Sequence, residues 1–143
     1  MLNKAYVEIT NQCNLSCAFC PKTRRPPRRM SAAEFAVVAE ALQGHVRFLY
    51  LHLMGEPLSH PELGEILNIA GQKGFRVCIT TNGTLLEQRS AVLTAHAAVL
   101  HKLSVSLHAL EGSGVGLSMD AYLKSACSVA RYSFKAAAFP IRN

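Results

Sequence analysis

Short apolar stretches typical of strands alternate with longer stretches of helical periodicity along most of the 143-residue chain. The predicted strands are residues 6–10, 48–54, 75–80 and 103–107, and residues 136–141 open a fifth. The predicted helices begin near Ser31, Ser59, Leu86 and Met119. Helices of this length serve as right-handed crossovers between parallel strands. The sequence therefore predicts an α/β protein with a parallel sheet, either an open doubly wound sheet or part of a barrel.

Two of these helices have a start signal that can be recognised in the sequence. Ser31 with Glu34, and Ser59 with Glu62, have the spacing of a capping box. Gly44 follows the first helical stretch and is expected to end it.

The length limits how much of a barrel the chain can form. A complete barrel of eight βα units takes about 250 residues, whereas four to five units fit in 143 residues. We expect one domain over residues 1–143, a partial TIM-type barrel that is incomplete at its C-terminus. A fifth strand at the end of a sheet has an unpaired edge. The chain is then a truncated reading frame or half of a split enzyme, or it binds a partner chain or dimerises at that edge.

The two faces of the predicted strands differ in character, because alternate residues of a strand point to opposite sides. One face is aliphatic and is expected under the helices: Val7, Ile9, Leu49, Leu51, Leu53, Val77, Ile79, Leu103, Val105 and Leu107. The other is largely polar: Tyr6, Glu8, Thr10, Tyr50, His52, Met54, Cys78, Thr80, Asn82, Ser104, Ser106 and His108. A polar inner face predicts a lined cavity, with one solvated sheet face as the alternative.

Three cysteines follow the first predicted strand at C-x-x-x-C-x-x-C spacing, namely Cys13, Cys17 and Cys20. Three thiolates can hold one 4Fe–4S cluster and leave one iron without a protein ligand. The same residues are also compatible with a structural zinc site, although such sites close with four ligands. Ligands of parallel α/β proteins bind at the carboxyl ends of the strands, which is where this loop is expected.

The cysteine spacing, with Phe19 just before the last cysteine, resembles the radical S-adenosylmethionine (radical SAM) superfamily. The resemblance implies a 4Fe–4S cluster on Cys13, Cys17 and Cys20 that reductively cleaves S-adenosylmethionine. The product is a 5'-deoxyadenosyl radical, which abstracts hydrogen from a substrate that the sequence does not identify. It also implies an external electron donor such as flavodoxin or ferredoxin.

Further residues match the family's motifs at the ends of later strands. Gly55 and Glu56 resemble the Gly-Gly-Glu-Pro turn that receives the amino group of S-adenosylmethionine, with Met54 in place of the first glycine. Asn82 resembles the ending of the third strand. At the end of the fourth strand, the resemblance extends to Ser104, Ser106 and His108. The resemblance implies that these residues and Phe19 bind the cofactor.

The net charge of +6 is concentrated in one loop, which carries Lys22, Arg24, Arg25, Arg28 and Arg29 around two prolines. This loop is either a solvated linker or an anion-binding rim. An iron–sulfur or zinc module for binding or electron transfer, with this loop contacting nucleic acid, is therefore one alternative to the enzyme. An inactive fragment is another. No apolar run reaches membrane-spanning length, so we expect a cytoplasmic protein without membrane contact.

Overall fold

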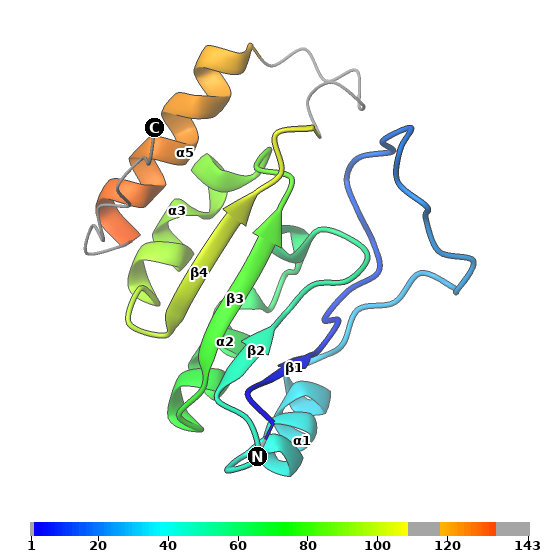
Figure 1. Ribbon diagram of the computed structural model, residues 1–143, viewed down its shortest axis with the longest axis vertical. Helices are drawn as coiled ribbons and strands as arrows, with labels where there is room; N and C mark the ends of the chain where they lie inside the picture. The colour runs from blue at the N-terminus through cyan, green and yellow to red at the C-terminus, as the bar shows by residue number, and fades with distance from the viewer. Residues whose placement is uncertain (1, 109–117, 134–143) are drawn as a thin grey trace.

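The structure is a computed structural model that describes residues 2–108 and 118–133 (Figure 1). Its elements are β1 (Lys4–Tyr6), α1 (Ala32–Leu42), β2 (Phe48–Tyr50), the 3-10 helix η1 (Pro57–Ser59), α2 (Leu63–Gln72), β3 (Arg76–Thr81), α3 (Leu86–Ala95), β4 (Leu100–Val105) and α5 (Met119–Ser133). The predicted fifth strand at residues 136–141 lies outside the described residues.

The described strands form one sheet in the order β1-β2-β3-β4, and every neighbouring pair is parallel. Helices α1, α2 and α3 lie behind the sheet in Figure 1, and α5 packs against α3. The arrows all point toward the end of the molecule that carries the loop after β1. The predicted α/β architecture with parallel strands is therefore confirmed.

The core lies between the sheet and these helices. Leu49 and Val77 on adjacent strands are fully buried, and so are Phe35 of α1 and Ile66 of α2. The prediction of an aliphatic face under the helices is confirmed for Val7, Ile9, Leu49, Leu51, Val77 and Ile79, all at most 6% exposed. It is wrong for two leucines beyond the strand ends, because the alternation no longer holds there: Leu53 is 64% exposed and Leu107 is 48% exposed.

One of the two predicted helix starts is confirmed. Ser31 accepts a hydrogen bond from the Glu34 amide, and the Glu34 carboxylate accepts one from the Ser31 amide. The capping box predicted at Ser59 and Glu62 is wrong. The Ser59 hydroxyl donates to the Glu56 carbonyl, and the Glu62 carboxylate instead accepts the Ala32 amide at the start of α1.

The first two strands, β1 and β2, are shorter than predicted, because the chain changes partners near their carboxyl ends. β1 ends at Tyr6, and further along Thr10 forms an isolated antiparallel bridge with Arg29 of the returning loop. β2 ends at Tyr50, and the Met54 amide donates to the Glu8 carboxylate rather than to a strand. These exchanges draw the cysteine loop and the turn after β2 together.

The second face of the sheet, toward the viewer in Figure 1, has no helix on it among the described elements. Tyr6 and Tyr50 stack at 4.9 Å between ring centroids, and the Lys4 amine lies 5.5 Å from each ring. His52 contacts both rings and accepts the Thr80 amide at Nδ1. This face therefore carries the aromatic and polar side chains that the alternation predicts.

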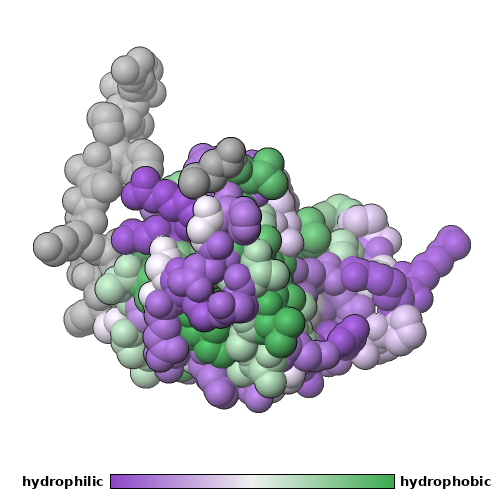
Figure 2. Space-filling model, turned by 90° about the horizontal axis from the view of Figure 1, so that it is seen from below, coloured by the Kyte–Doolittle hydropathy of each residue, from purple (hydrophilic) through white to green (hydrophobic). Residues whose placement is uncertain are grey.

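Figure 2 views the molecule from below, the end opposite the strands' arrowheads, and shows hydrophilic and hydrophobic residues interspersed there. Among the described residues, no helix is both long enough and apolar enough to cross a membrane.

Candidate active site

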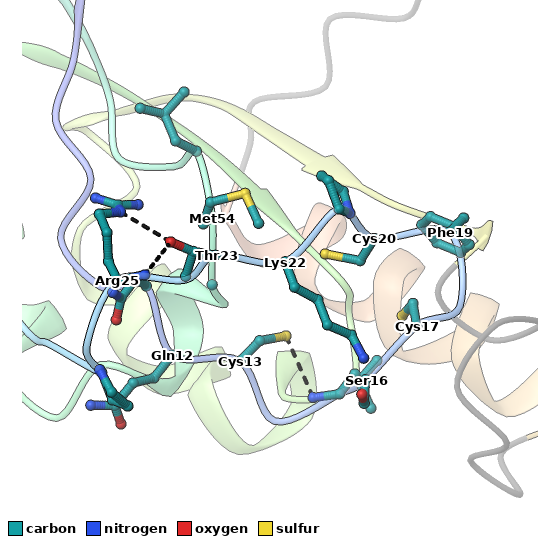
Figure 3. Close-up of a pocket in the computed structure, with 16 residues that line it drawn as sticks. Gln12, Cys13, Ser16, Cys17, Phe19, Cys20, Lys22, Thr23, Arg25 and Met54 are labelled. Atoms are coloured by element: carbon teal, nitrogen blue, oxygen red, sulfur yellow. Dashed lines mark hydrogen bonds between the residues drawn. The ribbon is translucent and has the colours of Figure 1, made fainter.

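The three cysteines of the loop after β1 line one pocket of about 670 Å³. Phe19 and Gly55 line the same pocket. In Figure 3 the sulfurs of Cys13, Cys17 and Cys20 are turned toward a common hollow. Residues near the start of the cysteine loop and the turn after β2 thus meet at the carboxyl end of the sheet, as the parallel topology requires.

The donor set fits an iron–sulfur cluster. Cys17 is buried, whereas Cys13 is exposed. The Cys13 sulfur accepts the Leu15 amide at 3.4 Å and the Asn82 side-chain amide at 3.7 Å, as a thiolate ligand does. Burial raises the pKa of the Cys13 thiol, and these two hydrogen bonds oppose the rise. Bound iron deprotonates such a thiol.

Within residues 2–108 and 118–133, no group of three His, Cys, Asp or Glu side chains is placed to hold a metal ion. A 4Fe–4S cluster does not require three side chains gathered around a single metal ion, because each of its thiolates binds a different iron of the cubane. In a tetrahedral zinc site, by contrast, sulfurs at 2.3 Å from one ion lie only about 3.8 Å apart.

Gly55 lets the turn after β2 approach the cysteine loop closely. Its φ is +80°, and a Cβ atom added there would lie 2.6 Å from the Thr10 carbonyl oxygen and 2.7 Å from that of Gln12. The next amide, of Glu56, donates to the Gln12 carbonyl at 2.8 Å. A side chain at this position would therefore separate the two segments that line the pocket.

The Glu56 side chain is directed into the protein rather than into the pocket. It is 1% exposed. One carboxylate oxygen accepts the Thr81 hydroxyl and the Leu58 amide, and the other accepts the Asn82 amide at 2.7 Å. Burial raises the pKa of Glu56, and these hydrogen bonds oppose the rise. Glu56 therefore fastens the turn after β2 to the end of β3.

Asn82 follows β3 and links it to the cysteine loop. Its side-chain nitrogen donates to the Asn14 side-chain oxygen at 2.9 Å, in addition to its contact with the Cys13 sulfur. Its side-chain oxygen accepts the Thr84 amide and hydroxyl. Asn82 is thus the predicted cofactor-binding residue with a direct polar contact to a cysteine.

Tyr122 brings α5 to the same end of the sheet. Its hydroxyl donates to the Asn82 carbonyl at 2.7 Å, with a longer contact of 3.2 Å to the Ser106 carbonyl. Its ring covers Gly83, where an added Cβ would lie 2.5 Å from the Tyr122 oxygen. Tyr122 falls within the helix predicted to begin near Met119, but the sequence carries no sign of its contact with Asn82.

The remaining predicted residues lie around the rim. Ser104 and Ser106 are partly exposed, and the Ser106 amide donates to the Thr81 carbonyl at 2.9 Å. His108 is exposed, and its ring lies edge-on to the ring of Phe19 at 6.4 Å. Neither serine nor His108 lines the pocket around the cysteines.

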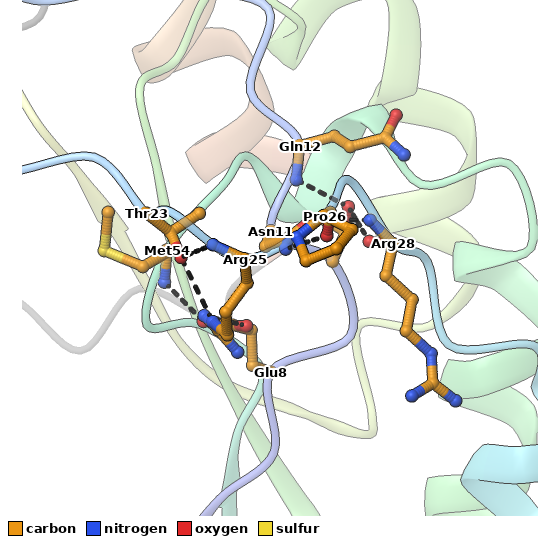
Figure 4. Close-up of polar contacts among 9 residues, drawn as sticks. Glu8, Asn11, Gln12, Thr23, Arg25, Pro26, Arg28 and Met54 are labelled. Atoms are coloured by element: carbon orange, nitrogen blue, oxygen red, sulfur yellow. Dashed lines mark hydrogen bonds and ion pairs between the residues drawn. The ribbon is translucent and has the colours of Figure 1, made fainter.

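The basic loop is partly neutralised within the protein. Glu8 is central to this arrangement: it pairs with Arg25 at 2.6 Å and accepts the Met54 amide at 2.9 Å (Figure 4). Arg28 pairs with Glu34 at the start of α1. The loop is therefore braced against the turn after β2, and the position of Glu8 on the polar strand face is the sequence signal for this arrangement.

Comparison with known families tests the resemblance to the radical SAM superfamily. The model of the radical SAM superfamily matches residues 7–131. This chain belongs to the radical SAM superfamily. Membership implies a 4Fe–4S cluster and S-adenosylmethionine as cofactors, and a need for an electron donor and a substrate.

Curated radical SAM relatives match the chain over part of their own length. A GTP 3',8-cyclase of Chlorobaculum tepidum is 34% identical over 113 residues, which is 73% of this chain and 32% of the relative. An AdoMet-dependent heme synthase of Methanosarcina barkeri is 31% identical over 103 residues, 70% of this chain and 29% of the relative. The chain thus spans about a third of the length of these relatives.

Solved structures share the radical SAM fold. BtrN in complex with AdoMet and 2-DOIA superposes with a TM-score of 0.66 at 26% identity, over 87% of this chain and 55% of BtrN. SuiB of Streptococcus suis bound to its precursor peptide superposes with a TM-score of 0.71 at 19% identity, over 90% of this chain and 30% of SuiB. The second likeness bears on the fold alone. The predicted partial-barrel architecture is confirmed by these neighbours.

Proposed function

We propose that the chain forms the core domain of a radical SAM enzyme, in which Cys13, Cys17 and Cys20 hold a 4Fe–4S cluster. Such a cluster supplies the electron that cleaves S-adenosylmethionine to methionine and a 5'-deoxyadenosyl radical, which abstracts hydrogen from a substrate. The observation that carries the proposal is the shared pocket of the three cysteines and Gly55 at the carboxyl end of the sheet.

The other rim residues have separate roles in this proposal. Gly55 exposes backbone at the pocket wall and receives the amino group of S-adenosylmethionine. Glu56 supports the turn after β2 from inside the protein, because both its carboxylate oxygens are already hydrogen-bonded there. Phe19 and His108 form an aromatic edge beside the pocket, suited to an adenine ring.

Ser104 and Ser106 at the end of β4 offer hydroxyls to the ribose or the methionyl carboxylate. Asn82 contacts the cysteine loop directly. The electron donor is an external protein such as flavodoxin or ferredoxin. The relatives are named for unlike reactions, a GTP cyclisation and a heme synthesis, so the proposal stops at the shared reductive cleavage.

The test is anaerobic reconstitution of the full chain with iron and sulfide, followed by addition of S-adenosylmethionine and dithionite. We expect about four irons per chain and release of 5'-deoxyadenosine. Replacing Cys13, Cys17 or Cys20 with alanine should abolish both. Cys127→Ala is the matched control, because Cys127 is exposed on α5, outside the pocket.

Two results contradict the proposal. One is deoxyadenosine release that persists in the three pocket variants. The other is a fully reconstituted chain that releases no deoxyadenosine above the level of the Cys13→Ala variant.

A further inference from the structure

The geometry points to Asn82 as a hydrogen-bond donor to the Cys13 thiolate, and we propose that this bond raises the reduction potential of a cluster held there. The inference rests on the proposed function. It concerns the side-chain amide of Asn82, whose nitrogen lies 3.7 Å from the Cys13 sulfur.

The orientation of the Asn82 amide follows from its partners. An asparagine side chain has an accepting end and a donating end that look alike in shape. The Thr84 backbone amide, which can only donate, lies 3.0 Å from one end of the Asn82 side chain. That end must be the oxygen, so the NH₂ group is the end that faces Cys13.

A closed ring of hydrogen bonds holds this orientation. The Asn82 NH₂ group donates to the Asn14 oxygen at 2.9 Å, and the Asn14 NH₂ group donates to the Thr84 hydroxyl at 2.9 Å. The Thr84 hydroxyl completes the ring by donating to the Asn82 oxygen at 2.8 Å. Each donor in the ring has an acceptor. The second hydrogen of the Asn82 NH₂ group is therefore left for the Cys13 sulfur.

The backbone of Asn82 is fixed on both sides as well. Its amide donates to the Glu56 carboxylate at 2.7 Å, and its carbonyl accepts the Tyr122 hydroxyl at 2.7 Å. Asn82 itself is 9% exposed. Three segments distant in sequence thus converge on one residue and leave its NH₂ group directed at one thiol.

A donor at a cysteine sulfur affects the two oxidation states of a cluster unequally. Reduction adds negative charge that spreads over the sulfurs, and an N–H group beside a sulfur stabilises that charge. Removing the donor makes reduction harder. The Leu15 backbone amide also donates to Cys13 at 3.4 Å, but only a proline at position 15 would remove it, and proline would also constrain the backbone of the loop. Asn82 is the side chain whose loss reports this effect.

The test is a mediated redox titration of the anaerobically reconstituted full chain, followed by electron paramagnetic resonance of the reduced cluster. At a fixed solution potential, Asn82→Ala should lower the ratio of reduced to oxidised cluster about fivefold, which converts to about 40 mV for a one-electron couple. Asn82→Asp should lower it further, because a carboxylate oxygen then faces the sulfur. Thr84→Val, which loosens the ring but keeps the donor, should give a smaller decrease.

Asn68→Ala is the matched control. Asn68 lies on α2 and its side-chain oxygen contacts His96, so this variant should titrate like the unsubstituted chain.

The inference is overturned if the Asn82 variants keep their cluster and titrate like Asn68→Ala. It is also overturned if all three variants at Asn82 and Thr84 lose the cluster while remaining folded by circular dichroism, because the role would then be cluster retention. An unsubstituted chain that binds no cluster instead refutes the proposed function.

Discussion

Replacing Gly55 with alanine tests whether the close approach of the turn after β2 to the cysteine loop is required. Two costs apply. A φ of +80° is unfavourable for an alanine by about 1–2 kcal/mol. The new Cβ would also meet the Thr10 carbonyl oxygen at 2.6 Å, where real Cβ contacts essentially never fall below 3.0 Å.

The second cost can be estimated from what must move. The three close atoms at Gly55 all belong to the backbone, and one of them, the Gln12 carbonyl oxygen, accepts the Glu56 amide at 2.8 Å. Separating the segments breaks that hydrogen bond, at about 1–3 kcal/mol, and forces an overpacked contact, at about 1–3 kcal/mol. Alanine also restricts the unfolded chain, which offsets about 0.4–1 kcal/mol of this destabilisation. We expect Gly55→Ala to lower the free energy of unfolding by about 3–5 kcal/mol.

Two other glycines isolate the backbone cost. Gly44 and Gly74 have φ of +78° and +79°, and an added Cβ at either meets nothing within 4 Å. Alanine at these positions should therefore cost only about 1 kcal/mol. The assay is urea unfolding of each full-length variant, followed by circular dichroism. A Gly55→Ala variant that unfolds within about 0.5 kcal/mol of Gly44→Ala would refute the packing argument.

Three further substitutions test the contacts around the site. Glu56→Gln should lower the free energy of unfolding in urea by about 1–3 kcal/mol, because an NH₂ group then faces the Asn82 amide. Burial raises the pKa of Glu56 above 4.5, so the contribution of this carboxyl to stability is full below pH 4.5 and declines as the pH rises through the raised pKa. The glutamine variant should lack this decline. Burial lowers the pKa of the fully buried His60 below 6.5, so its contribution to stability is present above pH 6.5 and lost as the pH falls through the lowered pKa. Between about pH 7 and pH 5, the urea midpoint should therefore fall less in His60→Gln than in the unsubstituted chain. An equal fall of the midpoint with pH in both proteins would contradict this. Tyr122→Phe keeps the ring over Gly83 but removes the hydroxyl, so thermal unfolding should show a loss of about 1 kcal/mol, and an unchanged midpoint would argue against the hydrogen bond to Asn82.

The fold was largely predictable, because parallel βα units leave two periodicities in the sequence. Burial of Leu49 and Val77 follows from alternation, and the start of α1 follows from its capping box. The strand ends were not predictable, since Thr10 and Met54 exchange strand partners for a returning loop and a carboxylate. Contacts of that kind depend on three-dimensional proximity and leave no local pattern.

The candidate site divides in the same way. The spacing of the cysteines and the glycine of the turn after β2 are local features, and both could be recognised. The inward direction of the Glu56 carboxylate could not, because its partners Thr81 and Asn82 lie about 25 positions away. Asn14 and Tyr122 gave no signal for a comparable reason, since their polar contacts join separate elements.

The anchoring of the cysteine loop has a consequence for engineering. The loop is tied at its entrance to Gly55, near its first cysteine to Asn82, and at its exit by the pairing of Thr10 with Arg29. Between Cys20 and Arg28 the loop is held by Arg25, which pairs with Glu8, and by the Pro26 carbonyl, which accepts the Asn11 side-chain amide, so an exchange of residues with a homologue has to keep these two contacts. With those contacts kept, residues 21–24 are the stretch to exchange for changing the pocket wall, which Pro21, Lys22 and Thr23 line.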